Sequence, residues 1–433
     1  MARILLFFLL ILSGLCLFAT PWFSALAYVA NSLLQPQYIW HWVFDGIPVF
    51  KITAALAILS FLITFAKRKS EFSIYKCPQN FLLMGIWVWM HLSDIFSPFT
   101  NAAASVSPAI VLDTIDAILI MYFVLLPVLN AEKPLKYFCS IFVLVGVYYV
   151  YWANSAYFTE SWHLFSNNRL KGPASSPYAD GNVLSVLILM TLPFLILEFG
   201  RRGGWAIRLV LALFVVFSWH SLILFGSRAA LLSSIVMLLL IALVVRSKKM
   251  NIILGISFAV FVSYQGALML QRATDTVEQA QVGNDEPINP RLISWSVGLK
   301  LIPEYPLFGA GVQKFEAASR VHFPGKTQHV AHNTFLNFSV NSGLIAGVCY
   351  LLLIYTILKR FLAIRSHGYD QTSFLSYALL SSTISLLVFF VSSVFLDLII
   401  FEPFYMMLII NLIAWEFWIK RDGCNTSETA VNL

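Results

Sequence analysis

The chain of 433 residues contains 59% hydrophobic and only 11% charged residues, whereas about a quarter of the residues are charged in a soluble domain. This composition excludes a water-soluble domain of any size. The formal net charge of +7 does not indicate nucleic-acid binding, because the Lys and Arg residues lie between apolar runs, where they fix orientation in a membrane.

Apolar runs of about 20 residues, long enough to cross a bilayer, recur along the whole chain. The first run, residues 4–34, is too long for one straight crossing and contains Pro21, which predicts one broken or re-entrant unit. A signal peptide is the alternative, but the many spans that follow favour an uncleaved anchor. Further spans are expected at 49–66, 81–96, 110–130, 135–153, 183–199, 205–222, 229–245, 251–268, 334–358, 372–395 and 397–419. The sequence therefore predicts an all-α polytopic membrane bundle of about twelve transmembrane helices.

The distribution of Lys and Arg predicts the orientation of this bundle, because basic residues favour the cytoplasmic side. With both termini in the cytoplasm, most of the 28 basic residues fall in cytoplasmic segments, among them Arg3, Lys67 and Lys133. The exceptions in the short outer segments are Lys51, Arg169, Lys171 and Arg228. Anion binding is one reason to keep a basic residue on the translocated side. A solvated charge is the better explanation for Lys51, but not for Arg228.

The chain divides into four regions. These are an N-terminal transmembrane bundle (1–270), a periplasmic loop with amphipathic helices (271–333), C-terminal transmembrane helices (334–420) and a cytoplasmic tail (421–433). In the loop, Pro290 stands at a helix start, and the apolar residues that follow at helical spacing are Leu292, Trp295, Leu299 and Ile302. This pattern predicts an amphipathic helix on the outer membrane surface, followed by a second short helix near 312–320.

The strongest candidate for chemistry is His332, where the long loop enters the span expected at 334–358. Asn333 or Thr334 can cap that helix, which places His332 beside the helix N-terminus. The positive end of the helix dipole disfavours a protonated imidazole, so this histidine would stay neutral and able to accept a proton. A polar loop histidine is the alternative interpretation, and it is the favoured one for His329. Asn333 and His329 are secondary candidates for substrate binding.

A second candidate is Arg228, at the outer start of the span expected at 229–245. Ser227 is a natural N-cap, so an arginine fork and free backbone N–H groups would face the same place. These are the parts of a phosphate site. The alternative is an interfacial arginine that reaches the lipid headgroups.

Other basic residues are weaker candidates. Arg291 opens the amphipathic helix of the long loop, where a solvated first-turn residue is the simpler interpretation. Arg169 and Lys171 lie in a turn-rich external segment, close to Asn182, which could line a sugar site or cap the next helix. No Cys/His spacing and no nucleotide-binding motif indicates a metal or a cofactor, and we expect neither.

Arginines and one neutral histidine on the outer face suit a substrate with a lipid diphosphate leaving group. When a glycosidic bond to diphosphate breaks, negative charge builds on the leaving oxygen, and arginines can neutralise it without a metal. His332 would deprotonate the acceptor hydroxyl, which attacks the anomeric carbon from the opposite side. A single displacement of this kind inverts the anomeric configuration.

The same residues occur in an order that resembles the O-antigen ligase/polymerase family of bacterial membrane glycosyltransferases. The matching motifs are Gly226-Ser-Arg228, Arg291-Leu-Ile-Ser-Trp295, Pro306-Leu-Phe-Gly309-Ala-Gly311, His332-Asn-Thr-Phe and Gly343-Leu-Ile-Ala-Gly347. The Gly343/Gly347 pair by itself indicates close helix packing. The segment from Arg169 to Asn182 also resembles members associated with exosortase systems. One departure is Asn341, near which the family often has an acidic residue.

The resemblance implies that Arg228 and Arg291 contact undecaprenyl diphosphate and that His332 is the catalytic residue. It implies an O-antigen ligase-type, inverting glycosyltransferase that moves a glycan to lipid A-core oligosaccharide on the periplasmic side of the bacterial inner membrane. An O-antigen polymerase and a protein O-oligosaccharyltransferase are alternatives with the same chemistry and another acceptor. A lipid-linked sugar flippase is a further alternative, which predicts basic residues along a path across the membrane rather than on one face.

Overall fold

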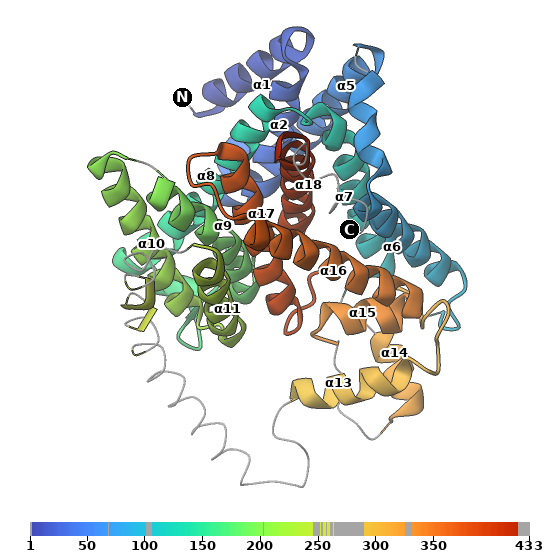
Figure 1. The fold of residues 1–433 in the computed structure, drawn as a ribbon. Helices are drawn as coiled ribbons and strands as arrows, with labels where there is room; N and C mark the ends of the chain where they lie inside the picture. Colours follow the sequence, from blue (N-terminus) through green and yellow to red (C-terminus); the bar gives the residue numbers. More distant parts are fainter. Residues whose placement is uncertain are drawn as a thin grey trace.

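The computed structural model describes residues 2–67, 69–100, 106–201, 203–245, 290–324 and 331–422, with a few residues between 252 and 263. The helices are α1 (Ala2–Ala19), α2 (Pro21–Leu34), α3 (Pro36–Ile39), α4 (His41–Phe44), α5 (Val49–Lys67), η1 (Lys69–Lys76), α6 (Pro78–Ile95), α7 (Pro108–Val128), α8 (Glu132–Phe158), η2 (Trp162–Leu164), α9 (Gly181–Arg201), α10 (Trp205–Phe225), α11 (Arg228–Val244), α13 (Pro290–Leu301), α14 (Phe315–His322), α15 (Thr334–Asn341), α16 (Gly343–His367), α17 (Phe374–Ser393) and α18 (Glu402–Asp422). One short hairpin of β1 (Phe165–Ser166) and β2 (Arg169–Leu170) joins α8 to α9 (Figure 1).

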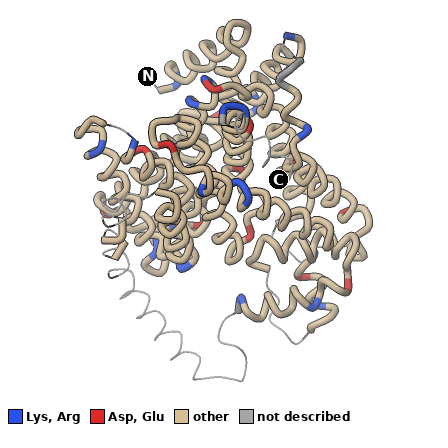
Figure 2. The backbone as a smooth tube through the Cα atoms, viewed as in Figure 1, with Lys and Arg blue, Asp and Glu red and all other residues tan. Residues whose placement is uncertain are grey.

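Among the described residues, nine helices are long and apolar enough to cross a membrane. They are α1, α5, α7, α8, α9, α10, α16, α17 and α18. This confirms an all-α polytopic membrane protein, although not the expected number of twelve spans. Helix α11 has 17 residues and is shorter than these nine. Most of the span expected at 251–268 lies outside the described residues. Most of the chain carries no charge (Figure 2).

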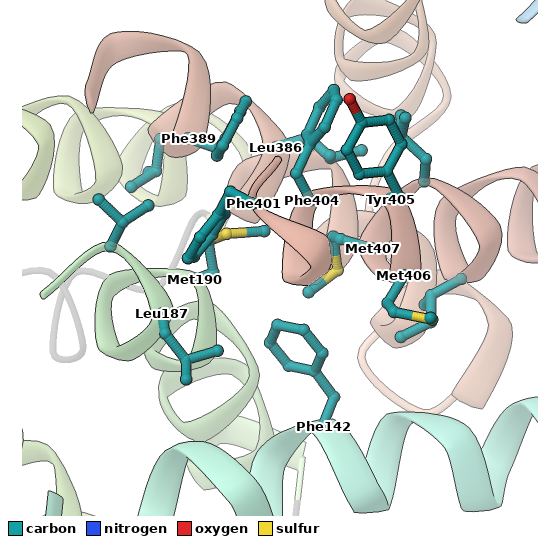
Figure 3. Close-up of a cluster of buried hydrophobic side chains, with 14 of the residues drawn as sticks. Phe142, Leu187, Met190, Leu386, Phe389, Phe401, Phe404, Tyr405, Met406 and Met407 are labelled. Atoms are coloured by element: carbon teal, nitrogen blue, oxygen red, sulfur yellow. The ribbon is translucent and has the colours of Figure 1, made fainter. Parts of the chain in front are cut away.

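Helices α9, α17 and α18 form the centre of the bundle. In α17, 89% of the residues in its most apolar stretch are buried. Neighbouring helices surround it, which explains why apolar residues occur on all of its faces. Its Phe389 ring stacks on Phe404 of α18 with the centroids 4.2 Å apart. Leu187 and Met190 of α9 and Phe142 of α8 lie in the same cluster (Figure 3).

The first apolar run folds into two antiparallel helices, α1 and α2, which reverse at Thr20–Pro21. The Ser24 hydroxyl donates to the Ser13 carbonyl oxygen at 2.5 Å, so the two helices lie side by side. Helix α1 lies at the edge of the molecule (Figure 1), and only 11% of its apolar window is buried. The break predicted at Pro21 is therefore confirmed, and it is a complete reversal.

This reversal places Arg3 at the end of the α1–α2 hairpin that lies opposite its turn. The Arg3 guanidinium donates to the Trp42 carbonyl oxygen at 2.8 Å, beyond the end of α2. Trp22, at the turn, instead lies under the Lys133 ammonium at 5.7 Å. Arg3 and Lys133 therefore lie near opposite ends of the α1–α2 hairpin, and the side of the membrane on which the N-terminus lies stays a prediction. A single crossing was expected because Pro21 can kink a helix without reversing the chain.

The span expected at 334–358 is broken into α15 and α16. Gly343 has φ +82°, and a Cβ there would collide with the Leu307 carbonyl oxygen. A Cβ at Gly347 would collide with the Ser339 hydroxyl of α15. Both glycines therefore allow close packing, as predicted from their spacing, and Gly343 also permits the backbone turn that ends α15.

Helices α13, α14 and α15 lie together at one corner of the molecule (Figure 1) and share a core of their own. Its members are Ile293, Val297, Leu301, Ala310, Phe315, Ala318, Ala331, Leu336 and Val340. The helix start predicted at Pro290 is confirmed, and contact of its Leu292/Leu299 stripe with the membrane surface stays a prediction. Leu292 and Leu299 are 52% and 60% exposed, and the buried face begins at Ile293. Both faces therefore carry apolar residues, one buried against α15 and the other exposed at Leu292 and Leu299.

Candidate functional site

Three arginines from separate segments line one cavity of about 530 Å³. They are Arg169 of β2, Arg228 of α11 and Arg291 of α13. The other lining residues are Asn182, Gly226, Ser227, Ala229, Leu232, Leu292, Trp295, Phe395 and Leu396. The structure therefore brings together the arginines that the sequence singled out on the outer side.

Arg228 is positioned by the turn between α10 and α11. Gly226 ends α10 in the left-handed region, at φ 58°, which a glycine adopts without strain. The Ser227 hydroxyl then caps α11 by accepting a hydrogen bond from the Ala230 N–H at 3.3 Å. This confirms the predicted cap and makes Arg228 the first residue of the helix. Its side chain is exposed.

Arg169 is held by the β1–β2 hairpin. Asn167 and Asn168 have φ values of 51° and 54°, as in the tight turns that form two-residue hairpin loops. The Arg169 Nε donates to the Phe225 carbonyl oxygen at 2.8 Å, and its Nη2 donates to Asn182 Oδ1 at 2.7 Å. Arg169 thus ties the hairpin to the end of α10 and the start of α9.

Arg291 lies in the first turn of α13, which packs onto α15 through its buried face. Four residues farther along, the Trp295 ring contacts the Phe395 ring with the centroids 5.8 Å apart. Phe395 belongs to the segment between α17 and α18. The wall of the cavity therefore combines the long loop with the C-terminal helices.

The cavity is electropositive. Three guanidinium groups line it, and no carboxylate does so among the residues that the structure describes. The first turns of α11 and α13 also face it, and helix N-termini favour anions. A guanidinium group can donate two parallel hydrogen bonds to two oxygens of one phosphate. The cavity volume is in the range of small-molecule sites. The arrangement is suited to bind a phosphorylated or diphosphorylated group.

His332 does not line this cavity, but it is connected to its wall. The residue has φ 46°, an uncommon backbone conformation for a residue other than glycine. Two residues later, the Thr334 hydroxyl donates to the Leu396 carbonyl oxygen at 2.8 Å and accepts from the Leu398 N–H at 3.0 Å. Since Leu396 lines the cavity, Thr334 fixes the His332 segment against that wall.

Asn333 has a structural role. Its Oδ1 accepts a hydrogen bond from the Leu336 N–H at 3.0 Å, so Asn333 caps α15, as predicted for this residue or Thr334. Lys171 does not line the cavity; its side chain is exposed, and its N–H donates to the Leu164 carbonyl oxygen at 2.9 Å. His329 lies outside the described residues.

Asp397, in the segment between α17 and α18, is a residue that the sequence did not single out. Asn337 of α15 donates to its Oδ2, and Asn341 donates to Asn337 Oδ1 at 2.5 Å. Burial raises the pKa of Asp397 to about 6, although hydrogen bonds from the Ile399 N–H and Asn337 act in the opposite direction. Its position at an outer helix end was the available signal.

The hydrogen bonds from Asn341 to Asn337 and from Asn337 to Asp397 concern the position where the family often has an acidic residue. A carboxylate does lie close to that position, but it comes from a different segment of the chain. The Oδ1 atoms of Asp397 and Asn341 are buried and make no hydrogen bond within the described residues. Buried polar atoms of this kind are uncommon and mark a place where a further polar group can be accommodated.

Together these features define a multi-pass helical membrane protein with an arginine-lined cavity beside the helices α13, α14 and α15. Residues 213–351, which include Arg228, Arg291 and His332, match the family model described as O-antigen ligase. This match confirms the resemblance to the O-antigen ligase family seen in the motifs. Residues 1–203, which include Arg169, match a family of unknown function. No curated protein matches the chain.

Proposed function

We propose that the protein is an O-antigen ligase-type glycosyltransferase of the bacterial inner membrane. It transfers a glycan from undecaprenyl diphosphate to a hydroxyl of lipid A-core oligosaccharide at the periplasmic face. The observation that supports this most is the convergence of Arg169, Arg228 and Arg291 on one cavity. Two of these residues lie in the segment that matches the O-antigen ligase family.

The arginines would act on the leaving group. As the bond between the anomeric carbon and the diphosphate oxygen breaks, its electron pair stays on that oxygen. Guanidinium groups placed beforehand around the diphosphate stabilise this charge without a metal ion. A bidentate contact to the diphosphate would also fix the orientation of the sugar that is transferred.

His332 would act on the acceptor. An imidazole nitrogen takes the proton of the acceptor hydroxyl while its oxygen attacks the anomeric carbon on the face opposite the diphosphate. One displacement inverts the anomeric configuration. Thr334 of α15 donates to the Leu396 carbonyl oxygen, and Asp397 accepts from Asn337 of α15. These two contacts hold α15 against the segment between α17 and α18, and they would keep His332 at the correct distance from the arginine cavity. Thr334 and Asp397 are positioning residues in this scheme.

An O-antigen polymerase or a protein O-oligosaccharyltransferase would use the same donor chemistry with another acceptor. A flippase fits less well, because the three arginines gather at one end of the bundle instead of following a path across it. The identity of the acceptor is therefore what an experiment has to determine first.

The test is complementation of a deletion strain with the native chain or with His332→Ala. Lipopolysaccharide, carrier-lipid and glycoprotein fractions are analysed together. A matched control is His322→Ala on α14, whose ring lies 2.8 Å from the Tyr305 hydroxyl and outside the cavity. We expect the native chain and the control to restore long glycans on lipid A-core, and His332→Ala to leave them on the carrier.

Other outcomes would change the assignment. Cores capped by single repeat units in the variant would identify a polymerase, and a change confined to glycoproteins would identify a protein glycosyltransferase. Full activity of His332→Ala would remove the catalytic role of this histidine.

A further inference from the structure

A second cavity, of about 390 Å³, lies at the opposite end of the bundle from the arginine site. It is formed where the α1–α2 turn meets the end of α5 and the loop between α7 and α8. Lining residues include Phe18, Trp22, Ile63, Lys67 and Lys133. Helix α8 starts here and runs for 27 residues toward the hairpin that carries Arg169, which places the two cavities at its two ends.

The cavity is positively charged. The side chains of Lys67 and Lys133 are exposed, and no carboxylate lines the cavity within the described part of the chain. The neighbouring carboxylate, Glu132, lies 3.2 Å from the Lys136 ammonium one turn along α8. It therefore does not neutralise the two lysines of the cavity.

The start of α8 adds to this charge. Its N-cap is Ala131, which has no side chain that could accept a hydrogen bond from the first turn. Ala131 and Lys133 both line the cavity, so the positive end of the helix dipole faces it. Together with the two ammonium groups, this is an environment that favours a phosphate.

The other wall is apolar and aromatic. Phe18 of α1, which is 72% exposed, and Ile63 of α5 both line the cavity. Trp22 stacks on Tyr137 with ring centroids 5.3 Å apart and lies 5.7 Å from the Lys133 ammonium. Tryptophan and lysine side by side are typical of the interface between headgroups and acyl chains.

We propose that this cavity binds one anionic phospholipid of the adjacent leaflet. Its phosphate lies between Lys67 and Lys133, and an acyl chain covers Phe18 and Ile63. Free phosphate shares the phosphate chemistry but would leave the apolar wall exposed. Since little of α1 is buried by protein, the lipid also holds the α1–α2 hairpin against the bundle.

The test measures lipid binding to the purified full chain in a neutral detergent. Phosphatidylglycerol, phosphatidylcholine and inorganic phosphate are titrated separately, with thermal unfolding and native mass spectrometry as readouts. The variants are Lys67→Ala/Lys133→Ala, the charge-preserving Lys67→Arg/Lys133→Arg, and the control Lys359→Ala. Lys359 lies 4.9 Å above the Tyr355 ring of α16 and does not line the cavity.

We expect phosphatidylglycerol to raise the melting temperature of the native chain and to be retained as one bound lipid. Its half-saturating concentration should rise about tenfold or more in the double alanine variant, and stay unchanged in the arginine pair and in Lys359→Ala. Equal binding by all variants, or equal stabilisation by phosphatidylcholine, would overturn the proposal. So would an equal effect of inorganic phosphate alone. If the double alanine variant does not fold, loss of binding in the folded arginine pair would also contradict it.

Discussion

The Thr334 hydroxyl donates a hydrogen bond of 2.8 Å to the Leu396 carbonyl oxygen and so joins the helix that follows His332 to the wall of the arginine cavity. These residues are 62 positions apart in the chain. The contact explains how a histidine that does not line the cavity can still be held in a fixed relation to it.

Thr334→Val should reduce transfer activity while leaving the fold in place. Valine has the shape of threonine but cannot bind Leu396 and Leu398, and a shift of about 1 Å in a reacting group costs up to about 100-fold in rate. Loss of the two buried hydrogen bonds should also lower stability by about 1–3 kcal/mol. Initial rates with purified donor and acceptor measure the effect. Thr334→Ser, which keeps the hydroxyl, should be nearly native; an inactive Thr334→Ser would contradict this role.

Arg228→Ala and Arg291→Ala should each lower turnover by about 100-fold or more, because each removes a charge that stabilises the leaving diphosphate. Arg228→Lys should retain part of the activity, since it keeps the charge and loses the paired hydrogen bonds. Turnover at saturating donor is the relevant measurement. The control is Arg320→Ala on α14, whose Nη2 lies 2.6 Å from Glu316 Oε1. A control as inactive as the cavity variants would show that the losses are structural.

Asp397 should make stability depend on pH. Its pKa is raised from 3.8 to about 6 by burial, so the folded state binds the proton more tightly than the unfolded state. Stability is therefore highest below about pH 4, falls as the pH rises to about 6, and is then constant, with a loss of about 1–3 kcal/mol. Melting temperatures of the native chain and Asp397→Asn should converge at low pH and separate above pH 6, with the variant more stable. Parallel curves would exclude this carboxyl as the cause.

Gly343→Ala should prevent accumulation of folded protein. The residue has φ +82°, and its Cβ would meet the Leu307 carbonyl oxygen, so both the conformation and the packing oppose a side chain. Gly14→Ala is the matched control, because nothing lies within 4 Å of a Cβ there. Monodispersity after purification in detergent reports the difference. A well-folded Gly343→Ala protein would show that the turn can relax.

Transfer by the purified protein should persist in excess chelator, because the arginines take the place of a metal in the proposed mechanism. The measurement is the initial rate before and after treatment with a chelator, followed by addition of single divalent cations. A loss of activity that one cation restores would require a metal in the mechanism. The control is donor stability, followed separately, since the diphosphate bond must survive the treatment.

The sequence predicted the parts of the site that depend on local chemistry. The caps at Ser227 and Asn333 and the helix start at Pro290 follow from side-chain propensities, and each is present. Long apolar runs similarly predicted the spanning helices. These features need only a few neighbouring residues to be recognised.

Features that depend on distant contacts could not be predicted in this way. The link between Asn337 and Asp397 joins residues 60 positions apart, and no local pattern encodes it. The reversal at Thr20–Pro21 depends on the contact of Ser24 with Ser13 and of Arg3 with Trp42. The buried face of α13 depends on which of two apolar stripes meets α15.

The hairpin that holds Arg169 has a consequence for exchanging parts between related proteins. Arg169 lies in the segment matched by one family, and its partner Phe225 lies in the segment matched by the other. The arginine cavity is thus assembled from residues on both sides of the α9–α10 connection. A chimera that takes its C-terminal half from a related protein would inherit two of the three arginines with that half. It would place Arg169 correctly only if the new α10 ended in the same turn.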